Sequence, residues 1–403
     1  MRITLIITFM ILSLNNKAQD PSMSQFDLNT SYTNPSFTGI EGTIKILTHS
    51  RSQWNYLNEN FKSSFFEISS QWKLNPNIGG TDQDLGYGIG IINEKIGIIS
   101  GENNVFINKI EIYPSASYLI KLEKNINAGI GFSMKYKKYS LDPDFLIFSD
   151  QWGEFGSFDE ISEVNINSDI NEIQNIDLGA GLLFIRRGRQ LRYRSNRIIL
   201  GHSLHNIRPN FENFLGVENN DAKFPFKHIS HAELYYSVPD YDERNTFVPR
   251  MKLVFKHERY IKKPLAYLQK TLFSKTEIGS TAFINNTNIE FGVLYRRVNH
   301  VERTDMMNNM QSFIPLLRYR FRIDNYLLNI SYSMDINSST KEDNLNFKNT
   351  LLTHEVGVSI DIFKGGSKNP SCPAYGTMKE NPLYQDIMNN GLLNKRKPKR
   401  NFN

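Results

Sequence analysis

Three arginines stand at alternate positions in the last third of the chain. Arg318, Arg320 and Arg322 are separated by aromatic residues, and alternate residues of a strand project from the same face. Guanidinium groups bind carboxylates and phosphates through paired hydrogen bonds, so the row could recognise an anionic partner or guide anions. Because buried charges need partners, internal ion pairing is the favoured interpretation. The candidate acids are Glu290, Asp335, Glu355 and Asp361.

Four histidines lie in two neighbouring segments and could approach one another. They are His202, His205, His228 and His231. A metal site needs convergent donors that are oriented by further hydrogen bonds, and this spacing does not require one. We therefore expect hydrogen-bonded or solvated histidines in the interior, and we predict no metal and no cofactor. The lone Cys372 cannot form an intramolecular disulfide.

No motif indicates catalysis. The chain contains no G-x-S-x-G nucleophile motif, no phosphate-binding loop and no dinucleotide fingerprint. A Ser, His and Asp set can be named in almost any chain with 8 histidines, and no single loop concentrates the three types here. We predict that the protein is not an enzyme and has no catalytic residues.

The elements that would position these side chains are strands. In 127–137 and in 325–336, apolar residues alternate with polar residues or glycines, so each segment has one apolar and one polar face. The same pattern predicts about fourteen strands. They are 42–51, 61–73, 84–94, 108–121, 125–138, 172–187, 195–206, 227–238, 249–257, 274–284, 287–298, 313–323, 325–336 and 352–363.

The connections between these strands alternate in length with few exceptions; the turns at 74–83, 188–194 and 239–248 are longer than is ideal for this pattern. Tight turns fall at Glu123-Lys124, at Asn285-Asn286 and at Asp324. The long connections are 139–171, 207–226, 258–273, 299–312 and 337–351. Bacterial outer-membrane barrels have an even number of strands, short periplasmic turns and long outer loops, whereas a soluble sandwich has no reason to sort its loops by length. The fold class predicted is all-β, a transmembrane antiparallel β-barrel whose N- and C-termini are periplasmic.

Both ends of the chain differ from this body. We predict a signal peptide over 1–18, a periplasmic N-terminal segment over 19–41, the barrel over 42–364 and a periplasmic basic tail over 365–403. The formal net charge is +6, but two of these positive charges lie in the signal peptide and five between Lys395 and Arg400. The body is therefore close to neutral, which argues against nucleic acid as a partner. The tail could contact peptidoglycan, an acidic periplasmic ring protein or lipid head groups.

Four short boxes carry a family resemblance. The first two are Gln19 to Phe26 and the box containing Asn34, Pro35 and Gly39; the others contain Arg51, Gln53 and Trp54, and His354 and Glu355. In this order they resemble the PorP/SprF family of type IX secretion components.

The resemblance implies an integral outer-membrane barrel of a Gram-negative bacterium that works with the secretion and gliding motility apparatus. It implies a large secreted adhesin as partner, exported or anchored through its C-terminal sorting domain, together with other type IX secretion components and outer-membrane lipid. Glycine-lined walls and a lumen of mixed charge would suit docking of a protein partner. The alternative is a general porin or solute channel, which requires an open lumen.

Structural roles are the favoured interpretation for the boxes. Arg51, Gln53 and Trp54 are expected to fix the first external loop. Asn34, Pro35 and Gly39 are expected to shape how the chain enters the barrel. Partner contact is the alternative for both groups.

Overall fold

The structure is a computed structural model, and it describes most of the barrel together with the segment that precedes it. The described residues are 23–40, 42–53, 61–74, 83–100, 103–123, 125–141, 172–187, 197–208, 225–237, 250–261, 273–283, 289–300, 310–323, 326–338, 353–362, 371–372 and 376–377. The predicted signal peptide, Trp54, the long connections and nearly all of the basic tail lie outside them.

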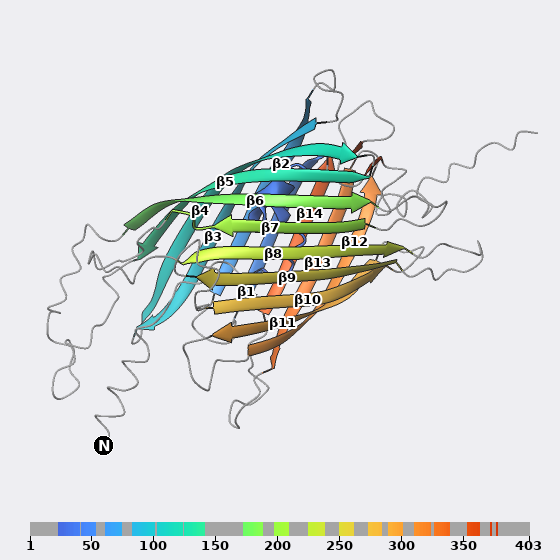
Figure 1. The fold of residues 1–403 in the computed structure, drawn as a ribbon. Helices are drawn as coiled ribbons and strands as arrows, with labels where there is room; N and C mark the ends of the chain where they lie inside the picture. The colour runs from blue at the N-terminus through green and yellow to red at the C-terminus, as the bar shows by residue number, and fades with distance from the viewer. Residues whose placement is uncertain are drawn as a thin grey trace, which may run out of the picture.

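Fourteen antiparallel strands form one closed barrel, in which each strand pairs with its sequence neighbours and β1 pairs with β14 (Figure 1). The first seven are β1 (Ile44–Gln53), β2 (Phe61–Leu74), β3 (Gln83–Ser100), β4 (Asn103–Glu123), β5 (Ile126–Leu141), β6 (Glu172–Arg187) and β7 (Arg197–His205). The others are β8 (Phe226–Ser237), β9 (Arg250–Ile261), β10 (Phe273–Phe283), β11 (Ile289–His300), β12 (Met310–Ile323), β13 (Tyr326–Ser338) and β14 (Thr353–Ile362). The predicted all-β antiparallel barrel and its strand number are confirmed, and the periplasmic position of the two termini stays a prediction.

Two details of the strands differ from the prediction. β3 and β4 pair from Gln83 to Ser100, so most of the connection expected over 95–107 is strand. Its β-branched residues, such as Ile96, Ile98 and Val105, favour the extended chain. After the barrel, β15 (Ser371–Cys372) and β16 (Gly376–Thr377) form a small separate sheet, and Cys372 lies in it.

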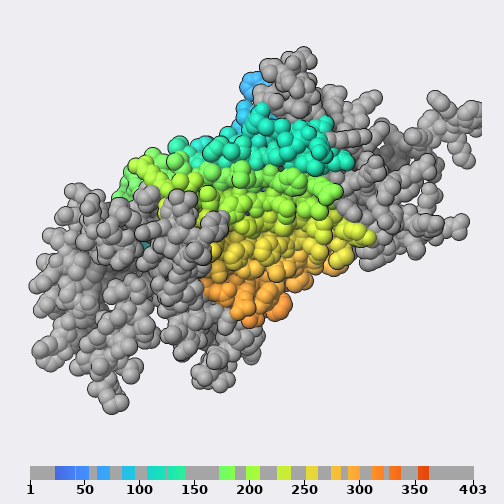
Figure 2. Space-filling view, in the orientation of Figure 1, coloured from blue at the N-terminus to red at the C-terminus, as the bar shows by residue number. Residues whose placement is uncertain are grey.

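The outer wall of the barrel is apolar and the inner wall is polar. Phe132 and Leu182 each expose 58% of their surface, and Leu317 exposes 53%, whereas the carboxylates of Glu290 and Glu355 are buried. Figure 2 shows this wall as a continuous outer surface over β5 to β11. A closed barrel satisfies every backbone pair between strands, and an apolar exterior matches lipid. Among the described residues, no helix is long and apolar enough to cross a membrane.

The two ends of the barrel are distinct. β1 starts and β14 ends at the same end as the short connections β4–β5, β10–β11 and β12–β13, which we call the turn end. The long predicted connections all lie at the opposite end, which we call the loop end. The predicted separation of short from long connections is therefore present only in part. β3 and β4 are joined at the loop end between Ser100 and Asn103, whereas the long interval from Ser237 to Arg250, between β8 and β9, falls at the turn end.

The N-terminal segment lies inside the barrel. Residues 23–40, which we call the plug, include α2 (Thr30–Thr33) and the short 3-10 helix η1 (Pro35–Phe37), and Figure 1 shows them among the strands. Most of their side chains are buried. The prediction that 19–41 precedes the barrel as an outside segment is therefore wrong for 23–40. Apolar residues do not recur in this segment with the period of a strand or a helix, so the sequence did not place it in the barrel. Its polar side chains nevertheless match a polar lumen.

Candidate functional site

The first part of the plug is fixed where the barrel closes. Arg51 of β1 and Glu355 of β14 are directly paired across the strands, and Arg51 Nη1 lies 2.5 Å from Glu355 Oε1. The backbone N–H of Ser24 donates to both carboxylate oxygens of Glu355 at 2.8 and 3.0 Å, and that of Gln25 donates at 3.2 Å. His49 Nε2 lies 3.3 Å from the same carboxylate. Two predicted family residues therefore meet and hold the plug.

A second acid completes this cluster. The Ser24 hydroxyl donates to Asp335 Oδ1 at 2.6 Å, and it accepts from Arg296 Nη2 at 2.6 Å. Arg296 Nη1 also lies 2.6 Å from Asp335, and its Nε donates to Glu277 at 2.7 Å. We call Ser24, His49, Arg51, Arg296, Asp335 and Glu355 the seam cluster. Its strand residues lie in the loop-end halves of β1, β11, β13 and β14.

The predicted arginine row contacts the plug as well as a wall acid. Arg318 lies 3.1 Å from Glu290 and 3.1 Å from Asp27, and Arg320 lies 2.6 Å from Glu290. Internal ion pairing is therefore confirmed for these two arginines and Glu290. Arg322 belongs to β12, but its side chain is outside the described residues.

Asp27 is the plug residue that the arginine row holds. Its carboxylate lies 3.0 Å from Lys252 Nζ in addition to its contact with Arg318. Burial alone would raise the pKa of the Asp27 carboxyl, but Arg318 and Lys252 outweigh burial and hold this pKa below its ordinary value. Asp27 therefore stays charged in the lumen, as a buried acid between two cations should.

The middle of the plug rests on aromatic rings. Tyr32 packs edge-on against Tyr113 and Phe65, with ring centroids 5.3 and 6.2 Å away. Lys135 Nζ lies 3.9 Å from the Tyr32 centroid, a cation–π contact. Tyr113 donates to Glu67 at 2.9 Å, and the Ser31 hydroxyl also donates to Glu67. This patch joins two parts of the plug. We call the part that contains Ser24 and Asp27 the charged half, and the part that contains Asn34 and Thr38 the neutral half.

Asn34 makes most of the side-chain hydrogen bonds of the neutral half. Its side chain caps η1 by accepting from the Ser36 N–H at 3.0 Å, and Pro35 begins the helix where no N–H is needed. Its amide donates to the Leu182 carbonyl at 3.0 Å and to His231 Nε2 at 3.0 Å. The side chain thus joins the plug to β6 and β8.

Wall glycines allow the plug to approach the strands closely. A Cβ on Gly131 would overlap the backbone of Pro35 and Ser36, and one on Gly86 would overlap the Thr38 carbonyl. Gly39 itself has a φ of +67°, a conformation that favours glycine, and a Cβ there would overlap Ser70. The glycines expected to receive a protein partner therefore receive the chain's own plug.

The four predicted histidines do not meet in the lumen. His205 and His231 face the plug, and His205 Nε2 donates to the Thr33 carbonyl at 3.0 Å. His202 and His228 project from the outer wall, with ring centroids 5.7 Å apart. The expectation of four interior histidines is wrong for these two, because a spacing of three residues along a strand reverses the face. No cluster of metal-binding side chains is present among the described residues.

The remaining family residues lie away from the seam cluster. Gln53 ends β1 at the loop end, and Trp54 is outside the described residues. His354 faces outward, where its Nδ1 accepts from the Tyr332 hydroxyl at 2.8 Å. His354 and Glu355 are neighbours on a strand and therefore take opposite faces.

The sequence did not indicate which residues hold the plug in the lumen. Ser24, Asp27 and Arg296 were not singled out, although Ser24 belongs to the first family box. The contact from Ser24 to Glu355 joins residues 331 positions apart. A strand pattern gives the face of a residue but not its partner across the lumen.

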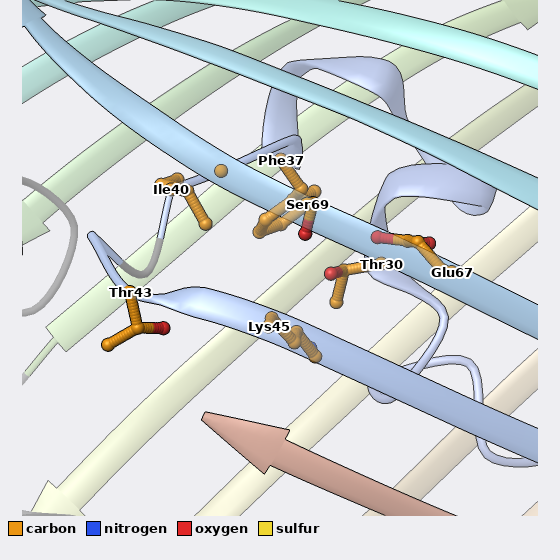
Figure 3. Close-up of a pocket in the computed structure, with 8 residues that line it drawn as sticks. Thr30, Phe37, Ile40, Thr43, Lys45, Glu67 and Ser69 are labelled. Atoms are coloured by element: carbon orange, nitrogen blue, oxygen red, sulfur yellow. The ribbon is translucent and has the colours of Figure 1, made fainter. Parts of the chain in front are cut away.

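Little space remains between the plug and the wall. Figure 3 shows one pocket near the turn end, a cavity of about 10 Å³ between the plug, β1 and β2, lined by residues that include Ile40, Lys45 and Glu67. A second cavity, of about 20 Å³, lies beside Phe26 and Lys256. Each has room for about one water molecule. Where the structure describes it, the lumen is filled.

The comparisons with known proteins identify one family. The sequence profile of the family described as "Type IX secretion system membrane protein PorP/SprF" matches residues 15–360. No curated protein matches the chain.

Several solved structures are similar at low identity. The toluene transporter TbuX of Ralstonia pickettii is 8% identical, with a TM-score of 0.43, and the match covers 83% of this chain and 92% of that chain. A Pseudomonas aeruginosa FadL homologue is 8% identical, with a TM-score of 0.42 and coverage of 83% and 94%. The β domain of the Bordetella autotransporter BrkA is 10% identical, with a TM-score of 0.32 and coverage of 80% and 99%. These likenesses carry nothing about what this chain binds.

Proposed function

Because this chain belongs to the PorP/SprF family of type IX secretion system membrane proteins, we propose that it is a sealed outer-membrane barrel that binds a large secreted adhesin. Binding would use the adhesin's C-terminal sorting domain and would assist its export or anchor it at the surface. The observation that supports this role is the filled lumen, in which plug residues contact both halves of the wall.

A filled lumen argues for a binding scaffold rather than a conduit. A solute channel needs an open, water-filled path, whereas Asp27 and Ser24 occupy the polar centre and are held there by buried charges. The glycine walls are also occupied. We therefore place the adhesin contact outside the lumen, at the loop end, where the long connections offer the surface that binding proteins usually use.

The proposed orientation of the barrel in the membrane follows from the rule that outer-membrane barrels have their long loops outside the cell. With the long connections outside the cell, the start of β1 and the end of β14 face the periplasm, where the basic tail would meet peptidoglycan or ring proteins of the secretion system. The signal peptide over 1–18 would direct export. Family membership itself makes other type IX secretion components the partners.

Deletion of the whole chain, followed by an inventory of surface proteins, tests the adhesin role. We expect one very large secreted protein to disappear from the surface and to return on complementation. Normal display of every adhesin would overturn the proposal.

Conductance separates the scaffold from the rival solute channel. Single barrels of the full chain in planar bilayers should stay closed, and a variant that lacks residues 23–40 should conduct. Large, steady pores from the full chain would favour the channel. The shortened variant tests whether the assay detects an open barrel of this size.

A further inference from the structure

The outer wall carries a cationic patch that the lumen does not explain. Two rows of residues, all polar except Leu204, cross five strands, β7 to β11, in their loop-end halves. In the first row, the directly paired residues are His202, Ser230, His257, Thr276 and Arg297. In the second row they are Leu204, His228, Arg259, Ser274 and Asn299. Strands lie about 4.8 Å apart, so the rows span about 20 Å.

No acidic residue belongs to either row. Arg259 and Arg297 carry fixed positive charge, and the half-buried His202 and His257 add basic nitrogen atoms, whereas His228 is buried. The wall is different on β5 and β6, where Lys138 at the loop end forms an ion pair with Glu172 at 2.7 Å. The rows on β7–β11, the wall that Figure 2 shows in green to orange, thus contain two arginines and no acid.

The next row toward the turn end is almost entirely apolar. It consists of Leu200, Ala232, Phe255, Ile278 and Tyr295, again directly paired from strand to strand. Phe255 and Ile278 are exposed on the outer wall, as lipid-facing residues should be. The cationic patch therefore lies directly on the loop-end side of this apolar row. Because the strands of a membrane barrel are tilted, each row crosses the wall obliquely toward its loop-end rim.

Hydrogen bonds within the patch orient its basic groups. His202 Nδ1 pairs with the Ser230 hydroxyl at 3.0 Å, and His257 Nδ1 pairs with the Thr276 hydroxyl at 2.9 Å. In both rings Nε2 is then the other polar edge. Arg297 Nε donates to Asn299 at 3.1 Å, which holds the guanidinium at the surface. A guanidinium group held in this way suits phosphate oxygens, which guanidinium groups bind in pairs.

We propose that this cationic patch binds the phosphate groups of the anionic glycolipid in the outer leaflet of the outer membrane. The loop end faces that leaflet in the orientation proposed above. Basic residues next to a membrane surface attract anionic lipids with about a fivefold gain in affinity per charge, which corresponds to about 1 kcal/mol. A bound lipid would fix this wall of the barrel against its surroundings.

The test is binding of purified lipids to the full-length barrel in detergent, measured by native mass spectrometry. The probes are bisphosphorylated lipid A, dephosphorylated lipid A and phosphatidylglycerol. The wild-type barrel should prefer the first, and the double variant Arg259→Gln with Arg297→Gln should bind it about 30-fold more weakly. Lys138→Gln, on the outer wall at the same end, is the matched control and should change binding less than twofold.

Three outcomes would overturn the proposal: equal binding of phosphorylated and dephosphorylated lipid A, equal binding of phosphatidylglycerol, or an unchanged double variant. Heat-modified migration on gels verifies that each variant is a folded barrel. Surface display of the adhesin is recorded in parallel, since the double variant leaves the plug and lumen intact. If the double variant loses its selectivity for phosphorylated lipid A but displays the adhesin normally, the defect is confined to the patch and the proposed adhesin role is unaffected.

Discussion

The two halves of the plug are held by different interactions: buried charged groups hold one, and close packing against glycines and backbone holds the other. Ser24 is fixed by hydrogen bonds to buried, ion-paired side chains of β11, β13 and β14, and Asp27 by ion pairs with side chains of β9 and β12. Asn34 and Thr38 instead lie against backbone and glycines of β3 to β7. Long charged side chains reach across a gap, whereas glycines remove it. The difference indicates that the neutral half depends on shape and tolerates no added volume, while the charged half depends on complete pairing.

The largest expected effect comes from filling the neutral half. Gly131→Leu would push a side chain into the backbone of Pro35 and Ser36, and neither backbone can yield as a flexible side chain could. Overpacking of this kind costs about 3 kcal/mol or more, so we expect the plug to leave the lumen. Single-barrel conductance should change from closed to open. Gly129→Ala is the control, because its Cβ meets only the tip of Leu119; a closed Gly131→Leu barrel would contradict the steric account.

Breaking the seam cluster should come next. Arg51→Met leaves the buried Glu355 without its paired guanidinium and with His49 in contact at 3.3 Å, which should lower the free energy of unfolding by about 3–5 kcal/mol. Adding Glu355→Leu should restore much of this loss, because an apolar pair leaves no uncompensated charge. Urea unfolding in detergent measures both. The single variant Glu355→Leu completes the cycle, and losses of the two single variants that simply add in the double variant would show that the charges are not coupled.

Asn34 tests the hydrogen bonds of the neutral half without adding volume. Asn34→Ala removes its bonds to the Leu182 carbonyl, to His231 and to Ser36. At about 1 kcal/mol each, the loss should be about 3 kcal/mol in the same urea measurement. A loss below about 1 kcal/mol would mean that shape alone holds this half.

Asp27 should give the smallest effect, because its cations keep other acids. Arg318 retains Glu290 and Lys252 retains Glu233, so Asp27→Asn should cost about 2 kcal/mol near neutral pH. The pKa of Asp27 is lowered by folding, so its contribution is present above its unfolded pKa of about 3.9 and is lost as the pH falls through the folded value. The stability difference between wild type and variant should therefore be constant from about pH 5 to 8 and shrink in stronger acid. A difference that grows on acidification would contradict the assignment.

Alternation predicted the barrel because each strand needs only its own residues to define its faces. The segments 127–137 and 325–336 show the pattern, and all fourteen strands appear where it places them. Arg318 and Arg320 were placed on the inner face for the same reason. His202 and His228 were predicted to face the lumen, but each lies three residues from an inward-facing histidine. Residues an odd number of positions apart take opposite faces of a strand, so the alternation rule already places both on the outer face.

The plug could not be predicted in the same way. Residues 23–40 have neither a helical nor a strand period, and two short helical turns are all the regular structure they form. Their order comes from partners distant in sequence, such as Glu355 for Ser24 and Leu182 for Asn34. The family boxes marked several of these residues without indicating that they meet.

The seam cluster has a consequence for assembly. Ser24 precedes every strand of the barrel, yet the two carboxylates that hold it belong to β13 and β14, the last strands to be made. The part of the plug that contains Ser24 therefore cannot be secured until the chain is nearly complete and β14 meets β1. A ring that closed without it would bring Arg51 and Glu355 together but leave Asp335 and Arg296 without the hydroxyl between them. The join between the first and last strands thus works as a checkpoint, most stable when the chain's own beginning is already inside.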